Sequence, residues 1–527
     1  MRMKNYKYYL GAFLALFLAA SCEDQLNINE NPNNPTEADV QLVLPQAIVA
    51  SASISNQFNS YGGHFGGMIA NAGGFSGFGN LLNYNLTPSD YNTMWVSTYQ
   101  DPLADLKYVI TKTEGVDELA YFNAAAKIMT VVNYQRLVDA FGNIPYSEAL
   151  RADEGIVAPA YDDAATIYQD LFAKLDEAIS IIDNAQFPLR LTKVTDPLFG
   201  ELDGSSAEAH ITAWKKYANT LKLRILLRLS TKSEFDSFVT QGFGNLDVTL
   251  GFLDDDAIVD PGYELNRPNP TWSTWGRTTA GALSNSSRIP TTYVISFYNG
   301  TKIDDAVRGE AIFVNFPSTP HNQLGNEVDN PTIVAGEVTW ASSKHEGVGV
   351  LKGPGMGQPL MLAAEARFLE AEAQLHGYIS GDVTTSFYKG IAASFAYLYK
   401  DENEAITKAV DPLVTTYKDA NSGNKLVIIE DALSDPEKLE AIITQKYIAL
   451  NMINSDEAWN EFRRTGYPKT VPGGDPALDI ASNKSEARSR ADNLPTRIMY
   501  PSSELSFNAT NYVNVNHVGD LIFWDPN

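Results

Sequence analysis

The sequence predicts a mainly α-helical protein whose helices are interrupted by a loop-rich insert. Apolar residues recur at the i, i+3, i+4, i+7 spacing of amphipathic helices in two separate regions of the chain. Between these regions the chain is rich in Gly, Pro, Asn and Thr and has no sustained helical period. Hydrophobic residues make up 44% of the 527 residues and aromatic residues 11%, which is enough to bury a large core.

Residues 1–21 have the layout of an export signal. A basic head precedes an apolar run, and a stretch of small residues leads directly to Cys22, the only cysteine of the chain. The apolar run is shorter than the roughly 20 residues that cross a bilayer. Cys22 stands where bacterial lipoprotein signals place the acylated cysteine, and we expect lipid there. Because Ala19 replaces the usual leucine of such signals, an ordinary signal peptide followed by an incidental cysteine is the alternative.

The chain is strongly acidic. It has 39 Lys and Arg against 64 Asp and Glu, a formal charge of −25, and loss of Arg2, Lys4 and Lys7 with the signal leaves −28. This balance argues against a nucleic-acid binder, which needs a basic surface. An anionic lipid surface would also repel such a body. We therefore expect attachment to a membrane through lipid alone, with residues 22–40 as a polar, turn-rich tether.

Residues 41–241 form the first part of the predicted helical body. The clearest amphipathic stripe covers residues 164–182, and two earlier helices are predicted over 91–110 and 119–138. A fourth helix over 208–229 interleaves basic with apolar residues. We interpret its basic face as solvated or ion-paired rather than as a binding surface, since the protein is acidic. Helices joined in pairs by short turns suggest a helical-repeat arrangement.

Residues 242–357 form the loop-rich insert, with short strands, and residues 358–465 return to helical spacing. The helices predicted in this second part of the body cover 359–376, 384–399, 434–452 and 456–464. Pro359 suits the first turn of the first of them, and Gly377 suits its end. The C-terminal segment, residues 466–527, is predicted to consist of loops.

The chain lacks the standard catalytic and metal-binding signatures. It has neither a phosphate-binding loop of the Walker type nor a His-Glu-x-x-His motif, and its six histidines lie far apart. We therefore predict no enzyme activity, no metal and no cofactor. Calcium binding by residues 254–256 with Asp260 is a weaker alternative, since their spacing fits no EF-hand loop. A lipid-anchored glycan hydrolase stays a second alternative, because a sequence with 64 acidic residues does not show which carboxylates converge.

Aromatic residues in predicted loops are the candidate ligand contacts. Trp272 and Trp275 lie in the Pro-rich stretch RPNPTWSTWG, and Phe75 and Phe78 lie in a Gly-rich stretch. Flat apolar rings on loops suit stacking against sugar rings, whose hydroxyls seek Asn, Asp and Gln. The alternative is that these aromatic side chains pin long loops to the body. That alternative weighs equally for the two tryptophans and more heavily for the two phenylalanines.

Six stretches, in order along the chain, together resemble the SusD/RagB family of surface lipoproteins of Bacteroidota, and particularly its SusD-like branch. They are residues 31–38 (NPNNPTEA), 134–150 (YQRLVDAFGNIPYSEAL), 214–230 (WKKYANTLKLRILLRLS), 362–373 (LAAEARFLEAEA), 445–468 (ending in RRTGYP) and 523–525 (FWD). They span nearly the whole mature chain.

The resemblance implies an α-helical fold with tetratricopeptide-like helix pairs and a loop-rich half that carries the ligand surface. It also implies an outer-membrane lipoprotein that faces the exterior, captures oligosaccharide and delivers it to a SusC-like, TonB-dependent barrel. Glu23 and Asp24 after the cysteine resemble the signal that sends such lipoproteins to the outer face. Capture of peptides is an alternative within the same family. Because binding residues vary across the family, the resemblance assigns no ligand contact.

Overall fold

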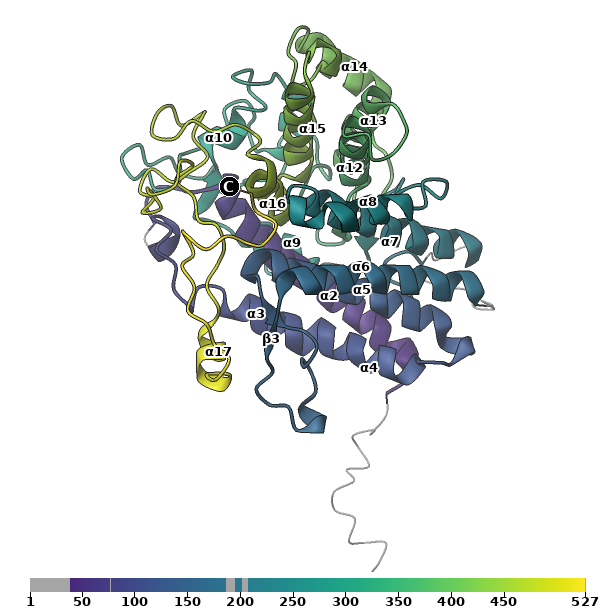
Figure 1. Ribbon diagram of the computed structural model, residues 1–527. Helices are drawn as coiled ribbons and strands as arrows, with labels where there is room; N and C mark the ends of the chain where they lie inside the picture. The colour runs from purple at the N-terminus through teal and green to yellow at the C-terminus, as the bar shows by residue number, and fades with distance from the viewer. Residues whose placement is uncertain (1–37, 76, 186–194, 201–206, 527) are drawn as a thin grey trace, which may run out of the picture.

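A long central helix, α2 (Val40–Phe65), connects the parts of the fold (Figure 1). It belongs to a computed structural model that describes residues 38–75, 77–185, 195–200 and 207–526. The carboxylate of Asp39 caps the helix by accepting from the backbone N–H of Gln41 at 2.9 Å. α2 packs against helices of both parts of the body and against the short strands. No helix was predicted here, because α2 is buried nearly all round and has no clear apolar stripe.

The first part of the body is a stack of helices in which neighbours along the chain pack against each other (Figure 1). Its helices are α3 (Asn92–Thr98), α4 (Ala104–Thr113), α5 (Ala120–Phe141), α6 (Ala164–Asn184) and α7 (Ala207–Leu229), followed by α8 (Asp236–Gly244). The helices predicted over 119–138, 164–182 and 208–229 are confirmed. The helix predicted over 91–110 is divided by a π-helical turn at Tyr99–Leu103, which contains Pro102. Proline has no N–H to give to the α-helical ladder, so the ladder is interrupted there.

The second part of the body is also helical. It consists of α12 (Ala363–Leu375), α13 (Val383–Leu398), α14 (Val410–Ala420), α15 (Asp435–Leu450) and α16 (Ser455–Thr465). The four predicted helices are present, and α14 was not predicted. Pro359 does not begin a helix, contrary to the prediction. It lies in strand β6 (Gln358–Met361), opposite Ile258 of β4 (Ala257–Val259), and the helix begins only at Ala363.

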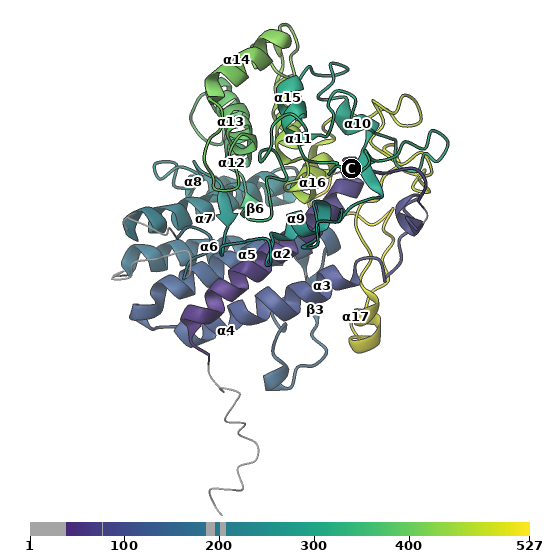
Figure 2. The same ribbon diagram turned by 180° about the vertical axis from the view of Figure 1, so that it is seen from behind.

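Loops and short elements gather on one flank of the helical body, at the left in Figure 1 and at the right in Figure 2. Three two-stranded antiparallel ladders hold them: β1 (Ile69–Asn71) with β5 (Arg288–Pro290), β2 (Ile144–Pro145) with β3 (Tyr161–Asp162), and β4 with β6. Short helices interrupt the loops at α9 (Pro270–Trp275), α10 (Thr292–Ile295), α11 (Ala306–Ile312) and α17 (Ser502–Phe507). The fold is therefore mainly α-helical with a loop-rich half, as predicted.

A network of buried charges joins the two parts of the body. Arg228 of α7 contacts Asp139 of α5 at 2.5 Å and Glu457 of α16 at 2.5 Å. Further buried pairs extend the network to α12 and α15: Arg224–Glu365, Arg464–Glu372, Arg464–Glu461, Lys446–Glu365 and Lys446–Glu461. The C-terminal Trp524 joins it by donating from Nε1 to Asp139 at 2.9 Å. Each charge is thereby compensated inside the protein.

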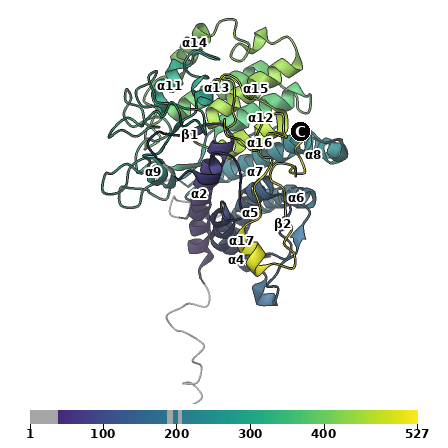
Figure 3. The same cartoon turned by 90° about the vertical axis from the view of Figure 1, so that its left-hand side faces the viewer.

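The N-terminal end of α2, the hairpin between β2 and β3, and helix α17 lie at one end of the molecule, which is the lower end in Figures 1, 2 and 3. Tyr108 of α4 fixes the start of the described chain by a hydrogen bond from its hydroxyl to the carbonyl of Ala38 at 2.8 Å. In the described part of the chain, no helix has the length and apolar character to span a membrane. Cys22 lies outside the described residues.

Candidate functional site

The two predicted tryptophans lie on the short helix α9. Asn269 caps this helix by accepting from the backbone N–H of Trp272 at 3.0 Å, and Pro270 occupies its first turn. Trp275 is only 3% exposed and packs edge-on against the ring of Trp340, with ring centroids 5.0 Å apart. Its ring belongs to the core. Trp272 is half-buried, so of this pair it is the residue that offers exposed aromatic surface.

The two predicted phenylalanines lie in the loop that follows β1. Like the two tryptophans, they differ in how far their rings are exposed. Phe75 is 45% exposed. Phe78 is nearly buried, and the guanidinium of Arg288 lies 5.7 Å from the centre of its ring. Phe78 thus pins the loop to strand β5, whereas Phe75 projects from it.

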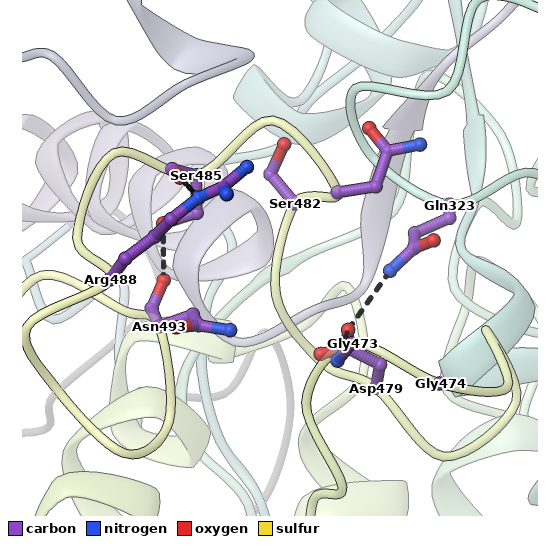
Figure 4. A pocket seen from close by; sticks show the side chains of 9 residues that line it. Gln323, Gly473, Gly474, Asp479, Ser482, Ser485, Arg488 and Asn493 are labelled. Atoms are coloured by element: carbon purple, nitrogen blue, oxygen red, sulfur yellow. Dashed lines mark hydrogen bonds between the residues drawn. The ribbon is translucent and has the colours of Figure 1, made fainter.

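A polar cavity of about 360 Å³ opens in the same loop-rich half (Figure 4). It is lined by Gln323, Gly473, Gly474, Asp479, Ser482, Asn483, Ser485, Arg488 and Asn493. Apart from Gln323, all of these residues come from the C-terminal segment. In Figure 4, Arg488 reaches past Ser485 toward Ser482, and Gln323 faces Asp479 on the opposite wall. Amide, hydroxyl and guanidinium groups of this kind can hydrogen-bond a sugar.

Hydrogen bonds between loops hold the walls of this cavity in place. The buried carboxylate of Asp479 accepts from Gln323 Nε2 at 3.2 Å and from the backbone N–H groups of Gly473 and Ala481 at 2.9 and 3.0 Å. Ser485 Oγ donates to the carbonyl of Asn493 at 2.6 Å. The bond from Gln323 ties the segment to the loop-rich insert, and the other three bonds tie residues of the segment to one another, so the cavity walls keep their shape without a helix or strand.

The cavity is joined to the loop that carries the two phenylalanines. Ser482 Oγ donates to the carbonyl of Leu82, and the backbone N–H of Ser482 donates to Tyr84 Oη at 3.1 Å. Gly325, with a φ of +83°, lies so close to Ser482 Oγ that a Cβ atom there would be 2.4 Å away. The segments around 82, 325 and 482 therefore meet at one wall.

Helix α9 lies nearer the N-terminal end of α2 than the cavity does. Asn56 of α2 donates to Thr274 of α9 at 2.8 Å, whereas Gly67, just past the end of α2, lies against Ile480 near the cavity. Asn56 and Gly67 are eleven positions apart, which corresponds to about 16 Å along a helix. Trp272 and the cavity thus share the loop-rich half but are separate contact points.

A second cavity, of about 500 Å³, adjoins the first through the same segment. Its lining comprises Phe462, Arg463, Gly466, Lys469, Thr470, Pro472, Ser489, Arg490, Ala491 and Asp492. Residues 472–474 and 488–493 stand between the two cavities. Neither cavity was predicted from the sequence. The available signal was composition: residues 481–493 (ASNKSEARSRADN) are rich in Ser, Asn, Asp and Arg on a segment predicted to be loop.

The acidic residues 254–256 are engaged by lysines. Lys400 contacts Asp255 at 3.0 Å and Asp256 at 3.3 Å, and Lys216 contacts Asp254 at 2.5 Å. Among the described residues, no group of three or more His, Cys, Asp or Glu side chains is placed to hold a metal ion.

The chain resembles known proteins over nearly its whole length. Residues 32–501 match the model of the SusD-like family, described as starch-binding and associating with the outer membrane. No curated protein matches the chain.

Solved structures share the fold at low sequence identity. A chitin-binding protein has a TM-score of 0.68 and 21% identity, over 92% of this chain and 99% of its own. A SusD homologue from Bacteroides uniformis has a TM-score of 0.68 and 21% identity, over 93% of this chain and 100% of its own. A SusD/RagB family protein from Bacteroides thetaiotaomicron has a TM-score of 0.69 and 18% identity, over 93% of this chain and 99% of its own.

Proposed function

Because this chain belongs to the SusD-like family of outer-membrane-associated, starch-binding proteins, we propose that it captures glycan at the cell surface without enzymatic turnover and passes it to a SusC-like, TonB-dependent barrel. The polar cavity of the C-terminal segment is the observation that supports this proposal most directly. Its amide, hydroxyl and guanidinium groups suit a hydroxylated ligand, and Phe75 and Trp272 offer exposed aromatic surface in the same half of the molecule.

Affinity electrophoresis against a panel of glycans that includes starch tests the proposal. We expect retention of the wild-type chain by at least one glycan and weaker retention of Trp272→Ala and Phe75→Ala. Trp275→Phe serves as a control, since it alters a buried ring and leaves the exposed surface unchanged. Undiminished retention of both alanine variants would remove these residues from the ligand surface. Retention by no glycan, together with binding of peptides, would favour the peptide alternative.

The hydrolase alternative predicts turnover. Incubating the purified soluble chain with the same panel and analysing the reducing ends separates the two functions. We expect no new reducing ends, and a clear product would overturn the binding proposal.

We place the contact with the barrel at the end of the molecule that carries the tether. There, Phe507 of α17 is 82% exposed and Val157 of the β2–β3 hairpin is 78% exposed. Asn508 and Asn511 join the two by donating to the carbonyls of Pro159 and Ala158 at 2.8 and 3.0 Å. Residues 498–527 contain no Lys or Arg, which is unlike a segment that binds anionic lipid and favours a protein partner.

A photo-crosslinking amino acid at position 507, in cells that make the barrel, tests this contact. We expect an adduct with the barrel from position 507 and none from the equally exposed position 433. An adduct from 433 alone would move the contact to another face, and crosslinking only to lipid would contradict a protein partner at this end.

A further inference from the structure

The polar cavity of the C-terminal segment is lined by one carboxylate, Asp479, and one guanidinium, Arg488. Its own carboxylate, Asp479, already accepts from three groups. The hydroxyls of Ser482 and Ser485 have given their protons to the carbonyls of Leu82 and Asn493. Asp479 keeps its negative charge, but its three hydrogen bonds fix its carboxylate in the cavity wall.

Arg488 is the main donor that remains. Its Nε donates to the carbonyl of Ser485 at 3.2 Å, and no carboxylate among the described residues forms an ion pair with its guanidinium. The nearest acidic residues along the chain are engaged elsewhere. Glu486 accepts from Asn83 Nδ2 at 2.7 Å, and Asp492 contacts Arg490 at 2.8 Å. The outer nitrogens of Arg488 are thus available to a ligand.

The buried arginines of the helical body contrast with Arg488, whose side chain is exposed to solvent. Arg136, Arg224, Arg228 and Arg464 each face at least one carboxylate within the protein. In a chain of net charge −25, carboxylates are plentiful, yet the guanidinium that lines this cavity has none. The amides of Asn483 and Asn493, which also line the cavity, can add neutral donors around it.

We propose that this cavity binds an acidic substituent of the captured glycan, a carboxylate or a sulfate, through the guanidinium of Arg488. The planar fork of Arg donates two parallel hydrogen bonds to such a group. The inference rests on the proposed function, since it names the class of glycan captured. The acidic body repels anions at long range, so a preference for an acidic glycan would have to arise from a local contact of this kind.

Matched pairs of ligands test the proposal with the full-length mature chain. The first pair is polygalacturonate and its methyl ester, which differ in the charge of the carboxyl group. The second pair is dextran sulfate and dextran, which separates a sulfate from a carboxylate. We expect the wild-type chain to bind the charged member of at least one pair about tenfold more tightly, the effect of one charge-assisted contact.

Arg488→Gln should lose this preference and bind the charged and the neutral member of the pair equally. Arg488→Lys should keep part of the preference, since it retains the charge but not the fork. Arg151→Gln, at an exposed arginine of the β2–β3 hairpin, is the matched control and should behave as wild type.

Equal binding of charged and neutral members by the wild-type chain would overturn the acidic-glycan inference and leave glycan capture standing. An Arg488→Gln protein that keeps the full preference would also overturn the acidic-glycan inference. So would a variant whose affinity for the charged and the neutral member falls by the same factor. Retention of no glycan, starch included, would contradict the proposed function as well.

Discussion

Arg228 shows how single residues hold the two parts of the body together. It is fully buried, and its guanidinium faces Asp139, Glu457 and Glu461. Burial by itself raises the pKa of Glu461, but the charges of Arg464, Lys446 and Arg228 outweigh it and lower the pKa to about 2. Glu461 is therefore charged in the folded protein at neutral pH and depends on its cationic partners.

Replacing Arg228 with Met should lower the free energy of unfolding by about 3–5 kcal/mol, because buried carboxylates would lose their partner. Urea unfolding followed by circular dichroism measures this. Arg151→Gln, which removes an exposed ion pair with Glu154, should leave stability unchanged. Equal effects of the two substitutions would show that the buried network contributes no more than a surface pair.

Lys302 gives a prediction about pH. Burial lowers the pKa of its ammonium to about 7, against an attraction to Asp475 that raises it. Its Nζ lies 3.6 Å from the centre of the Tyr293 ring and has no hydrogen-bond partner among the described residues. Between pH 7 and 10.5 the unfolded chain keeps this proton while the folded chain releases it, so the contribution of Lys302 to the free energy of unfolding rises with pH.

Lys302→Met should therefore be more stable than wild type at pH 7 and should show a smaller rise in stability from pH 7 to pH 9. Urea unfolding of both proteins at the two pH values measures the difference. Parallel slopes for wild type and variant would show that Lys302 titrates at its ordinary pKa.

At the scale of elements, five of the six segments that carry the family resemblance meet in the buried network. Asp139 belongs to residues 134–150, Arg228 to 214–230 and Glu365 to 362–373. Glu461 comes from residues 445–468, and Trp524 comes from 523–525. The sequence pattern that these segments share with the family is thus explained by packing inside the body. The cavity is lined by residues outside these segments.

The helix with the clearest apolar stripe, α6, was predicted to within two residues at its C-terminal end. α2 escaped prediction, because a helix surrounded by protein needs small and polar residues at its close contacts rather than a stripe. Asn59 illustrates this: its side chain bonds the backbone at Met452 and Ser455, both at 2.9 Å. The cavity could not be predicted either, because it depends on which loops meet. Trp275 belongs to the core because Trp340, 65 residues away in the sequence, covers its ring.

Gly62 marks the closest approach of α2 to α16. A Cβ atom at this position would lie 2.1 Å from the backbone nitrogen of Asp456 and 2.3 Å from its Cα. Gly62→Ala should therefore lower the free energy of unfolding by about 3 kcal/mol or more, despite the better helix propensity of Ala. Thermal or urea unfolding measures the loss. Gly244→Ala, at the end of α8 with open space around it, should cost nothing, and equal stability of the two variants would contradict the close contact.

At the scale of the whole molecule, a lipid on Cys22, as the sequence predicts, would make residues 22–40 a tether that limits how far the body can stand from the membrane. Ala38 lies sixteen positions after Cys22, and an extended chain over that distance reaches at most about 55 Å. The end of the body that carries Phe507 would then stay within reach of a barrel in the same membrane.

Lipid on Cys22 is the premise of this arrangement. Cells grown with labelled palmitate should incorporate the label into the wild-type chain and not into Cys22→Ala, and the variant should be released from the membrane fraction. No label on the wild-type protein, or equal label on both, would contradict lipidation at this cysteine.

The place of Trp524 in the core has a consequence for biogenesis. This residue, three positions before the end of the chain, donates to Asp139 of α5, and its carbonyl accepts from Thr231 just after α7. Helices made early in synthesis therefore lack part of their native packing until the last residues are present. A polypeptide with this dependence stays incompletely folded until Trp524 has been made, which would suit export in the unfolded state through the signal predicted at residues 1–21.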